Sequence, residues 1–73
     1  MPRIDMVKTG ANITALRKKN NITVRDLQNA MGFNTPQAIF KWQRGDTLPT
    51  LDNLVILSAM FNVTINDILV VKK

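Results

Sequence analysis

The sequence contains no cysteine, histidine, glutamate or tyrosine, and Ser58 is its only serine. Without thiols the chain has no disulfide framework and no thiolate metal site, which favours a reducing, cytoplasmic setting. The five aspartates are scattered, and no glycine-rich phosphate loop, metal-ligand cluster or nucleophile with a neighbouring base is present. We therefore predict that the protein is not an enzyme and that it takes no metal, cofactor or small-molecule ligand.

Long apolar runs are also absent. No stretch approaches the ~20 residues that a membrane-spanning helix needs, and no basic-then-apolar leader stands at the start of the sequence. The hydrophobic content of 45% nevertheless argues for a folded chain. At 73 residues, the expectation is a single domain over residues 1–73 with a small core and no membrane partner.

Acidic residues are few, and the basic ones are unevenly placed. Residues 1–44 hold eight Lys or Arg against two Asp, whereas residues 45–73 hold two Lys against three Asp, within an overall net charge of +5. Surface lysines can serve solubility alone, but a cationic half of a small domain also suits attraction to phosphate.

Residues 23–45 predict two short helices joined by a tight bend. Thr23 is a natural N-cap, and Asp26 three residues later supplies the acidic half of a capping box. A helix should therefore run from Val24 to about Met31, and Gly32 should end it as C-cap glycines do. This is the pattern of a helix-turn-helix.

The second helix of this pair is predicted from Pro36 to about Arg44, ending at Gly45. The Thr35 hydroxyl can cap free amides, and the fixed φ of proline suits the first helical position. Spacings of three and four give the pair one inner face, made by Leu27, Met31, Phe33, Ile39 and Trp42. The side chains left outside on the second helix are Gln37, Ala38, Phe40, Lys41 and Arg44. An amide, small and apolar groups and two cations on a short helix suit a DNA major groove.

Three further helices are expected around this pair, and no strand. The first follows Asp5 and runs from Met6 to about Lys19, with Val7, Ile13 and Leu16 pointing inward. The second follows Thr50, runs from Leu51 to about Phe61 and is apolar almost all round. The third follows Thr64 and runs from Ile65 to about Val70, where Asp67 repeats the cap pattern. Gly10 weakens the first helix by ~1 kcal/mol relative to alanine. The predicted fold is all-α, a compact five-helix bundle that contains a helix-turn-helix.

With these segments in hand, the chain resembles the Cro and phage-repressor (XRE-type) family of helix-turn-helix DNA-binding domains. The matching residues are Thr23-x-x-Asp26-Leu27, Met31-Gly32-Phe33, Ile39-x-x-Trp42-Gln43-Arg44-Gly45 and Leu51-x-x-Leu54, and the resemblance covers roughly residues 6 to 70. It implies a lambda-repressor-like bundle that binds double-stranded operator DNA as a dimer or as paired monomers and regulates transcription in bacteria or their phages. We predict a homodimer that acts as a repressor.

The resemblance also implies roles for single residues. Gln37, Ala38 and Lys41 stand where the family's recognition helix meets base edges, and Thr35 lies at the entry to that helix. The phosphate-contacting positions are Thr23, Val24, Arg44 and, in the turn after Gly45, Thr47. The bend is one residue longer than the commonest version. Gln43 replaces the glutamate that usually pairs with an arginine at the position of Arg17, so a hydrogen bond is the most that this pair can form.

Several of these side chains have a second interpretation. Gln37 either reads adenine through its amide or is an ordinary exposed helix residue. Lys41 reaches either guanine or a phosphate. Phe40 points toward solvent on a helical wheel, where it either contacts a thymine methyl or sugar or leans on one of the two preceding helices.

Apolar residues late in the chain provide a candidate dimer surface. Ile56, Met60 and Val70 occupy positions that suit a contact with a second copy, because contiguous exposed apolar area usually marks an interface. The alternative is that they pack near Ile4 and Met6. A rival function from another class follows from the same residues, namely a protein-interaction module, antitoxin-like or an anti-regulator, that acts through the last two helices.

Overall fold

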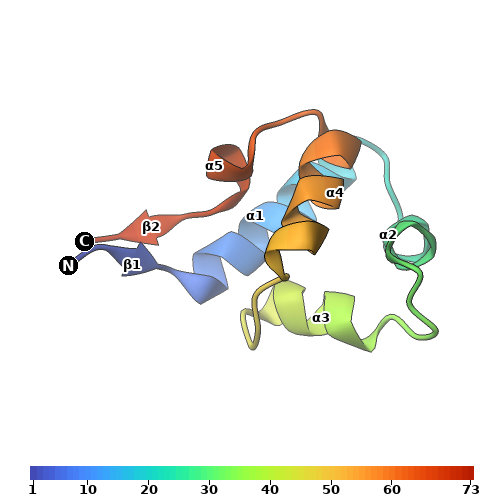
Figure 1. The fold of residues 1–73 in the computed structure, drawn as a ribbon, viewed down its shortest axis with the longest axis horizontal. Coiled ribbons are helices and arrows are strands. Elements are labelled where there is room, and N and C mark those ends of the chain that lie inside the picture. Colours follow the sequence, from blue (N-terminus) through green and yellow to red (C-terminus); the bar gives the residue numbers. More distant parts are fainter.

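A computed structural model describes all 73 residues as five helices with a short strand at each end of the chain (Figure 1). The elements are β1 (Arg3–Ile4), α1 (Met6–Lys19), α2 (Val24–Met31), α3 (Gln37–Arg44), α4 (Leu51–Phe61), α5 (Ile65–Ile68) and β2 (Val71–Lys72). The predicted bounds of α1, α2 and α4 are confirmed. α3 begins one residue later than predicted, because Pro36 takes the N-cap position itself.

The helices begin where the caps predict. The Thr23 hydroxyl accepts a hydrogen bond from the Asp26 amide at 3.0 Å, and the Asp26 carboxylate accepts one from the Thr23 amide at 2.9 Å, which completes the capping box of α2. Thr64 and Asp67 form the same box at α5. Asp5 caps α1. These bonds satisfy amides that have no partner inside the helix.

The two chain ends pair with each other as an antiparallel strand pair, so the expectation of no strand was wrong. The register places Arg3 opposite Lys72, and both termini lie at one end of the molecule (Figure 1). The predicted extension of the last helix to Val70 was also wrong. The Val70 carbonyl accepts from the Asp5 amide at 2.7 Å, and the Val70 amide donates to the Thr9 hydroxyl at 2.9 Å. These bonds hold the segment after α5 extended beside the start of α1.

All five helices contribute to one core. Its buried apolar side chains are Ile13, Leu27, Ile39, Trp42, Leu54, Leu57, Phe61 and Ile68. Leu16 packs against this core as expected, but Val7, which we expected to point inward, is 66% exposed. Thr9 is buried in its place, because its hydroxyl is required at the Val70 backbone.

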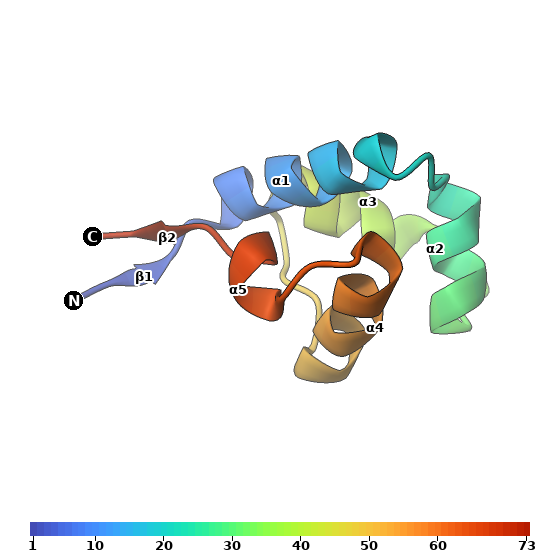
Figure 2. The same cartoon turned by 90° about the horizontal axis from the view of Figure 1, so that it is seen from above.

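Gly10 allows α1 and α3 to approach closely (Figure 2). A Cβ added at Gly10 would collide with the carbonyl oxygen of Trp42 and lie 2.7 Å from that of Gln43. A glycine that costs α1 helix propensity is therefore required by packing. Since the carbonyls belong to α3, this contact sets how deeply α3 sits against the bundle.

Candidate DNA-binding surface

A left-handed glycine and an aromatic contact shape the bend between α2 and α3. Gly32 has φ +70°, a conformation that glycine adopts without strain. The Phe33 amide then donates to the Gln28 carbonyl at 3.0 Å, and the Phe33 ring meets Trp42 edge to face with centroids 5.8 Å apart. Residues 32–36 thus form a defined turn, and the predicted helix-turn-helix is confirmed.

The inner side of α3 is fixed by packing and by α1. Ile39 is fully buried and Trp42 is 4% exposed. The Arg17 guanidinium donates from Nε to the Gln43 side-chain oxygen at 3.0 Å and from Nη1 to the Ile22 carbonyl at 3.1 Å. The predicted hydrogen bond between Arg17 and Gln43 is confirmed, and it ties α3 to the end of α1 and to the loop that leads into α2.

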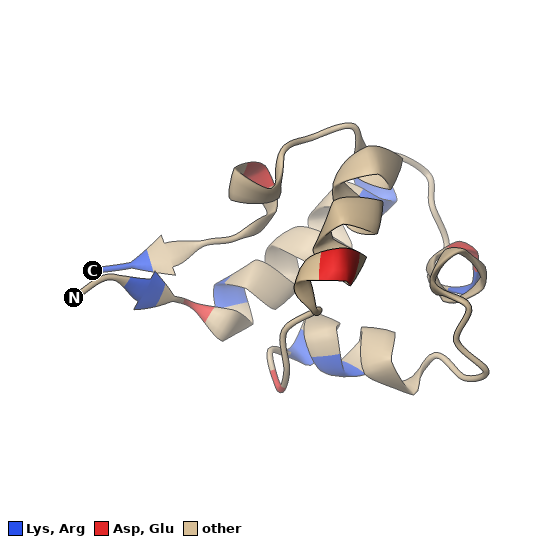
Figure 3. Ribbon diagram, in the orientation of Figure 1, with Lys and Arg blue, Asp and Glu red and all other residues tan.

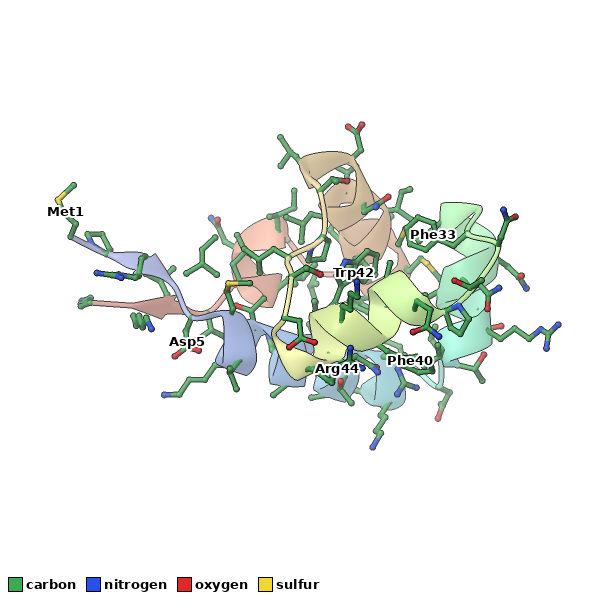
Figure 4. The ribbon with its side chains drawn as sticks, turned by 90° about the horizontal axis from the view of Figure 1, so that it is seen from below. Met1, Asp5, Phe33, Phe40, Trp42 and Arg44 are labelled. Carbon is green, nitrogen blue, oxygen red and sulfur yellow. The ribbon has the colours of Figure 1, made fainter.

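The outer side of α3 is a single exposed stripe. It consists of Gln37, Phe40, Lys41 and Arg44, whose spacings of three, four and seven residues place them on one face of a helix. α3 lies along the lower edge of the bundle in Figure 1, and no helix or strand lies below it. Figure 4 shows Phe40 and Arg44 on one side of α3 and Trp42 on another. We call these four residues the α3 stripe.

The predicted base-contacting residues lie on or beside the α3 stripe. Gln37 and Lys41 belong to it. Thr35 is exposed just before α3, where its hydroxyl oxygen is 3.5 Å from the Gln37 amide. Ala38 is half-buried. Since Pro36 provides no side-chain cap, the polar groups at the start of α3 are left almost without partners in the protein.

The four predicted phosphate-contacting residues are less alike in their surroundings. The Thr23 hydroxyl is engaged in the capping box: its oxygen accepts from the Asp26 amide, and it also hydrogen-bonds the Asp26 carboxylate. Val24 is half-buried against the core, but its amide is among the first of α2, where no intrahelical partner exists. Thr47 is exposed.

Arg44, the fourth, forms an ion pair that sequence reasoning missed. Its Nε donates to the Asp46 carboxylate at 2.9 Å, and the two side chains are 56% and 54% exposed. The signal in the sequence was the acidic residue directly after the helix-ending Gly45. A phosphate at Arg44 would therefore use the guanidinium donors that Asp46 leaves free.

Two carboxyl groups are held in their charged form by the capping boxes. The backbone amide of Thr23 donates to Asp26 and lowers the pKa of that carboxyl below its usual 3.8, and the Thr23 hydroxyl adds to the shift. Thr64 lowers the pKa of Asp67 in the same way. Asp26 is the only acidic residue of α2. A phosphate that approaches the start of α2 therefore meets a fixed negative charge beside the backbone amides of the first turn.

Charge divides the helices into two groups (Figure 3). α1, α2 and α3 all carry Lys or Arg, whereas the only charged residues of α4 and α5 are Asp52 and Asp67. The terminal strands add Arg3 and Lys72. The structure contains no cluster of acidic, histidine or cysteine side chains that would hold a metal ion, and no pocket. None of its helices has the length and apolarity to cross a membrane.

The residues of the predicted dimer surface lie on α4 and in the segment after α5. Ile56, Met60 and Val70 are all half-buried, and Met60 packs against the core. Val55, beside Ile56 on α4, is 53% exposed. At 100° per residue, Val55 and Ile56 point away from the buried side of α4.

A helix-turn-helix family model matches residues 13–68 of the chain. Three solved structures share its fold. The restriction-modification controller protein C.AhdI from Aeromonas hydrophila is 20% identical with a TM-score of 0.75, and the match covers 88% of this chain and 96% of that one. The clp gene regulator ClgR from C. glutamicum is 19% identical with a TM-score of 0.72, and the match covers 86% of this chain and 80% of that one. The DNA-binding domain of BldD is 18% identical with a TM-score of 0.70, and the match covers 89% of this chain and 93% of that one. A search of curated protein sequences found no match.

Proposed function

Because this chain belongs to the Cro and phage-repressor (XRE-type) family of helix-turn-helix proteins, whose members are non-enzymatic DNA-binding regulators, we propose that it is a sequence-specific transcriptional repressor that acts in the cytoplasm. Family membership supports DNA binding and transcriptional regulation. The observation that carries the finer proposal is the α3 stripe, an exposed row of one amide, one aromatic ring and two cations on a helix anchored by its other side.

Base contacts would select the sequence. A B-DNA major groove is about 12 Å wide and admits one α-helix, so α3 enters it with its stripe toward the base edges. The Gln37 amide pairs with adenine N6 and N7, and Lys41 donates to guanine O6 and N7. Thr35 and Ala38 flank these two residues at the start of α3 and provide a hydroxyl and a methyl group.

Phosphate contacts would set the position of the domain on the duplex. Arg44 and Thr47 lie after α3, and Thr23 and Val24 open α2, so the four residues bracket the helix-turn-helix on both sides. The available donors are the Arg44 guanidinium group, the Thr47 hydroxyl and the Val24 amide, whereas the Thr23 hydroxyl would have to leave the Asp26 carboxylate to reach a phosphate. Binding would weaken steeply with salt, because each neutralised phosphate releases counterions.

A homodimer would place two copies of α3 on one face of the duplex, with half-sites ~34 Å apart. The proposed contact is formed by Ile56, Met60 and Val70, and the exposure of Val55 next to Ile56 supports an apolar interface on α4. The same exposed groups would suit a different protein as partner, but a second copy accounts for them within a DNA-binding family. A bound dimer would exclude other proteins from the operator, which is the simplest form of repression.

Selection of binding sites from random duplexes at two salt concentrations tests this proposal. Wild-type protein should enrich a palindrome, and Gln37→Ala should lose about 1–3 kcal/mol of preference at one base pair of each half-site. Asn66→Ala, an exposed amide change on α5, is the matched control and should select the wild-type sequence. Equal losses on the selected and on random DNA for Gln37→Ala would rule out base reading by α3.

A further inference from the structure

Phe40 occupies the middle of the α3 stripe and is not part of the hydrophobic core. It is 37% exposed, whereas its helix neighbours Ile39 and Trp42 are 0% and 4% exposed. The ring pair of the structure joins Trp42 to Phe33 and does not involve Phe40. An exposed aromatic group between an amide and two cations, in the centre of a surface, is typical of a contact residue.

We propose that Phe40 recognises the C5 methyl group of a thymine in the major groove, and that it is a specificity-determining residue of this domain. The inference rests on the proposed function, since it requires α3 to enter the groove. A phenyl ring offers no conventional hydrogen-bond donor or acceptor. The thymine methyl is the apolar group that the major groove presents, and phenylalanine is among the residues that contact it.

The location of Phe40 relative to Gln37 restricts which thymine this is. The two residues are three positions apart on α3, which corresponds to about 4.5 Å of helix rise at ~1.5 Å per residue. Base pairs are spaced ~3.4 Å apart along the duplex. The methyl group should therefore belong to a base pair within about one or two steps of the one that Gln37 reads.

The partial burial of Phe40 is important for this role. Phe40 is 37% exposed, so part of the residue is covered by the protein and part is open to a partner. Arg44 on the same stripe would draw the phosphate backbone toward α3. It therefore supplies attraction without sequence preference, whereas the ring adds a preference for thymine over cytosine at one position.

Deoxyuridine provides the test, because it keeps the pairing and the O4 acceptor of thymidine and lacks only the C5 methyl. The probe is the duplex enriched by selection from random sequences, synthesised with each thymine replaced in turn by uracil. Dissociation constants of the full chain are measured by fluorescence anisotropy. For wild-type protein, one replacement per half-site should weaken binding about three- to fivefold, which is the factor expected for burying one methyl group.

The Phe40 variants then show whether this loss depends on the ring. Phe40→Ala should bind the thymine and uracil duplexes equally at that position, and Phe40→Leu should keep most of the methyl effect. Gln37→Ala is the matched control on the same stripe and should keep the full effect. The ratio of the two dissociation constants within one variant does not depend on the fraction of molecules that is folded, so a loss of stability in Phe40→Ala leaves the test valid.

Two results would overturn the assignment. One is a wild-type protein that tolerates uracil at every position, and the other is a methyl effect that persists undiminished in Phe40→Ala. Both leave DNA recognition by α3 intact and assign the ring to another role. If selection enriches no sequence at all, the proposed function fails, and the role of Phe40 fails with it.

Discussion

α2 and α3 have the same length, eight residues each, but they are stabilised in different ways. α2 begins with a complete capping box and contributes one buried side chain, Leu27. α3 begins at Pro36 without a side-chain cap and contributes two buried side chains, Ile39 and Trp42. α2 is therefore held largely by groups at its own start, whereas α3 is held by the core and by α1.

This difference matters for recognition. A helix that is anchored through its buried side can leave its opposite side and its first turn free for a partner without losing its position. The α3 stripe has that freedom: of its four side chains, only Arg44 forms an intramolecular hydrogen bond or ion pair, with Asp46.

Trp42→Ala should remove most of what holds α3. The substitution deletes a buried aromatic side chain that contacts Phe33, and a change of this kind costs ~3–5 kcal/mol. For a domain of this size, that loss approaches the whole free energy of unfolding. Urea denaturation should show a largely unfolded protein in buffer. Phe40→Ala, on the exposed side of the same helix, should lose ~1 kcal/mol or less, and comparable losses for the two variants would contradict the anchoring.

Gly10→Ala separates packing from helix propensity. Propensity alone predicts stabilisation by ~1 kcal/mol, because alanine is the better helix former. Packing predicts the opposite sign, because the new Cβ would press against the carbonyls of Trp42 and Gln43. Overpacking of this kind costs ~1–3 kcal/mol. Thermal unfolding decides between the two, and a raised melting temperature would show that α3 can move away from α1 at little cost.

Thr23→Ala and Thr35→Ala compare the starts of the two helices directly. Thr23 serves the capping box, so its loss should cost ~0.5–2 kcal/mol of stability. Thr35 makes only a long contact with the Gln37 amide, so its loss should change stability within ~0.5 kcal/mol while weakening DNA binding. Urea unfolding and anisotropy titrations measure both quantities. Equal destabilisation by the two variants would show that α3 is capped after all.

Acid should weaken the two capping boxes. The pKa values of Asp26 and Asp67 are lowered in the folded state from an ordinary 3.8. The stability they contribute is therefore fully present above about pH 3.8 and is lost as the pH falls through the lower folded-state pKa values. The free energy of unfolding, measured by urea denaturation at several pH values across this range, should fall less steeply with decreasing pH for an Asp26→Asn, Asp67→Asn double variant than for the wild type. Asp52→Asn, outside both boxes, is the control and should retain the wild-type slope. An unchanged slope in the double variant would contradict the assignment.

The helices and the turn could be predicted from the sequence because their determinants are local. Thr23 and Asp26 are three residues apart, and Gly32 and Gly45 directly follow the helices that they end. Buried and exposed positions of α3 also follow from its 3.6-residue period. The roles of the candidate site residues were predicted from the family resemblance. Family membership supports DNA binding and transcriptional regulation, and the roles of single residues remain predictions.

The features that were missed depend on contacts between distant segments. The strand pair joins Arg3 and Ile4 to Val71 and Lys72 at opposite ends of the chain, and no local pattern reports such a pairing. Thr9 is buried in place of Val7 because Val70 needs its hydroxyl. The requirement for glycine at position 10 follows from the approach of α3. In each case the residue type is explained only by a partner far along the chain.

The central claim is that the α3 stripe meets DNA, and amide chemical shifts of the labelled protein titrated with the selected duplex test it most directly. The account predicts that the largest changes occur in residues 34–47 and at the start of α2, with small changes through α4 and α5. Changes confined to α4 and α5, with the amides of α3 unmoved at saturation, would contradict it.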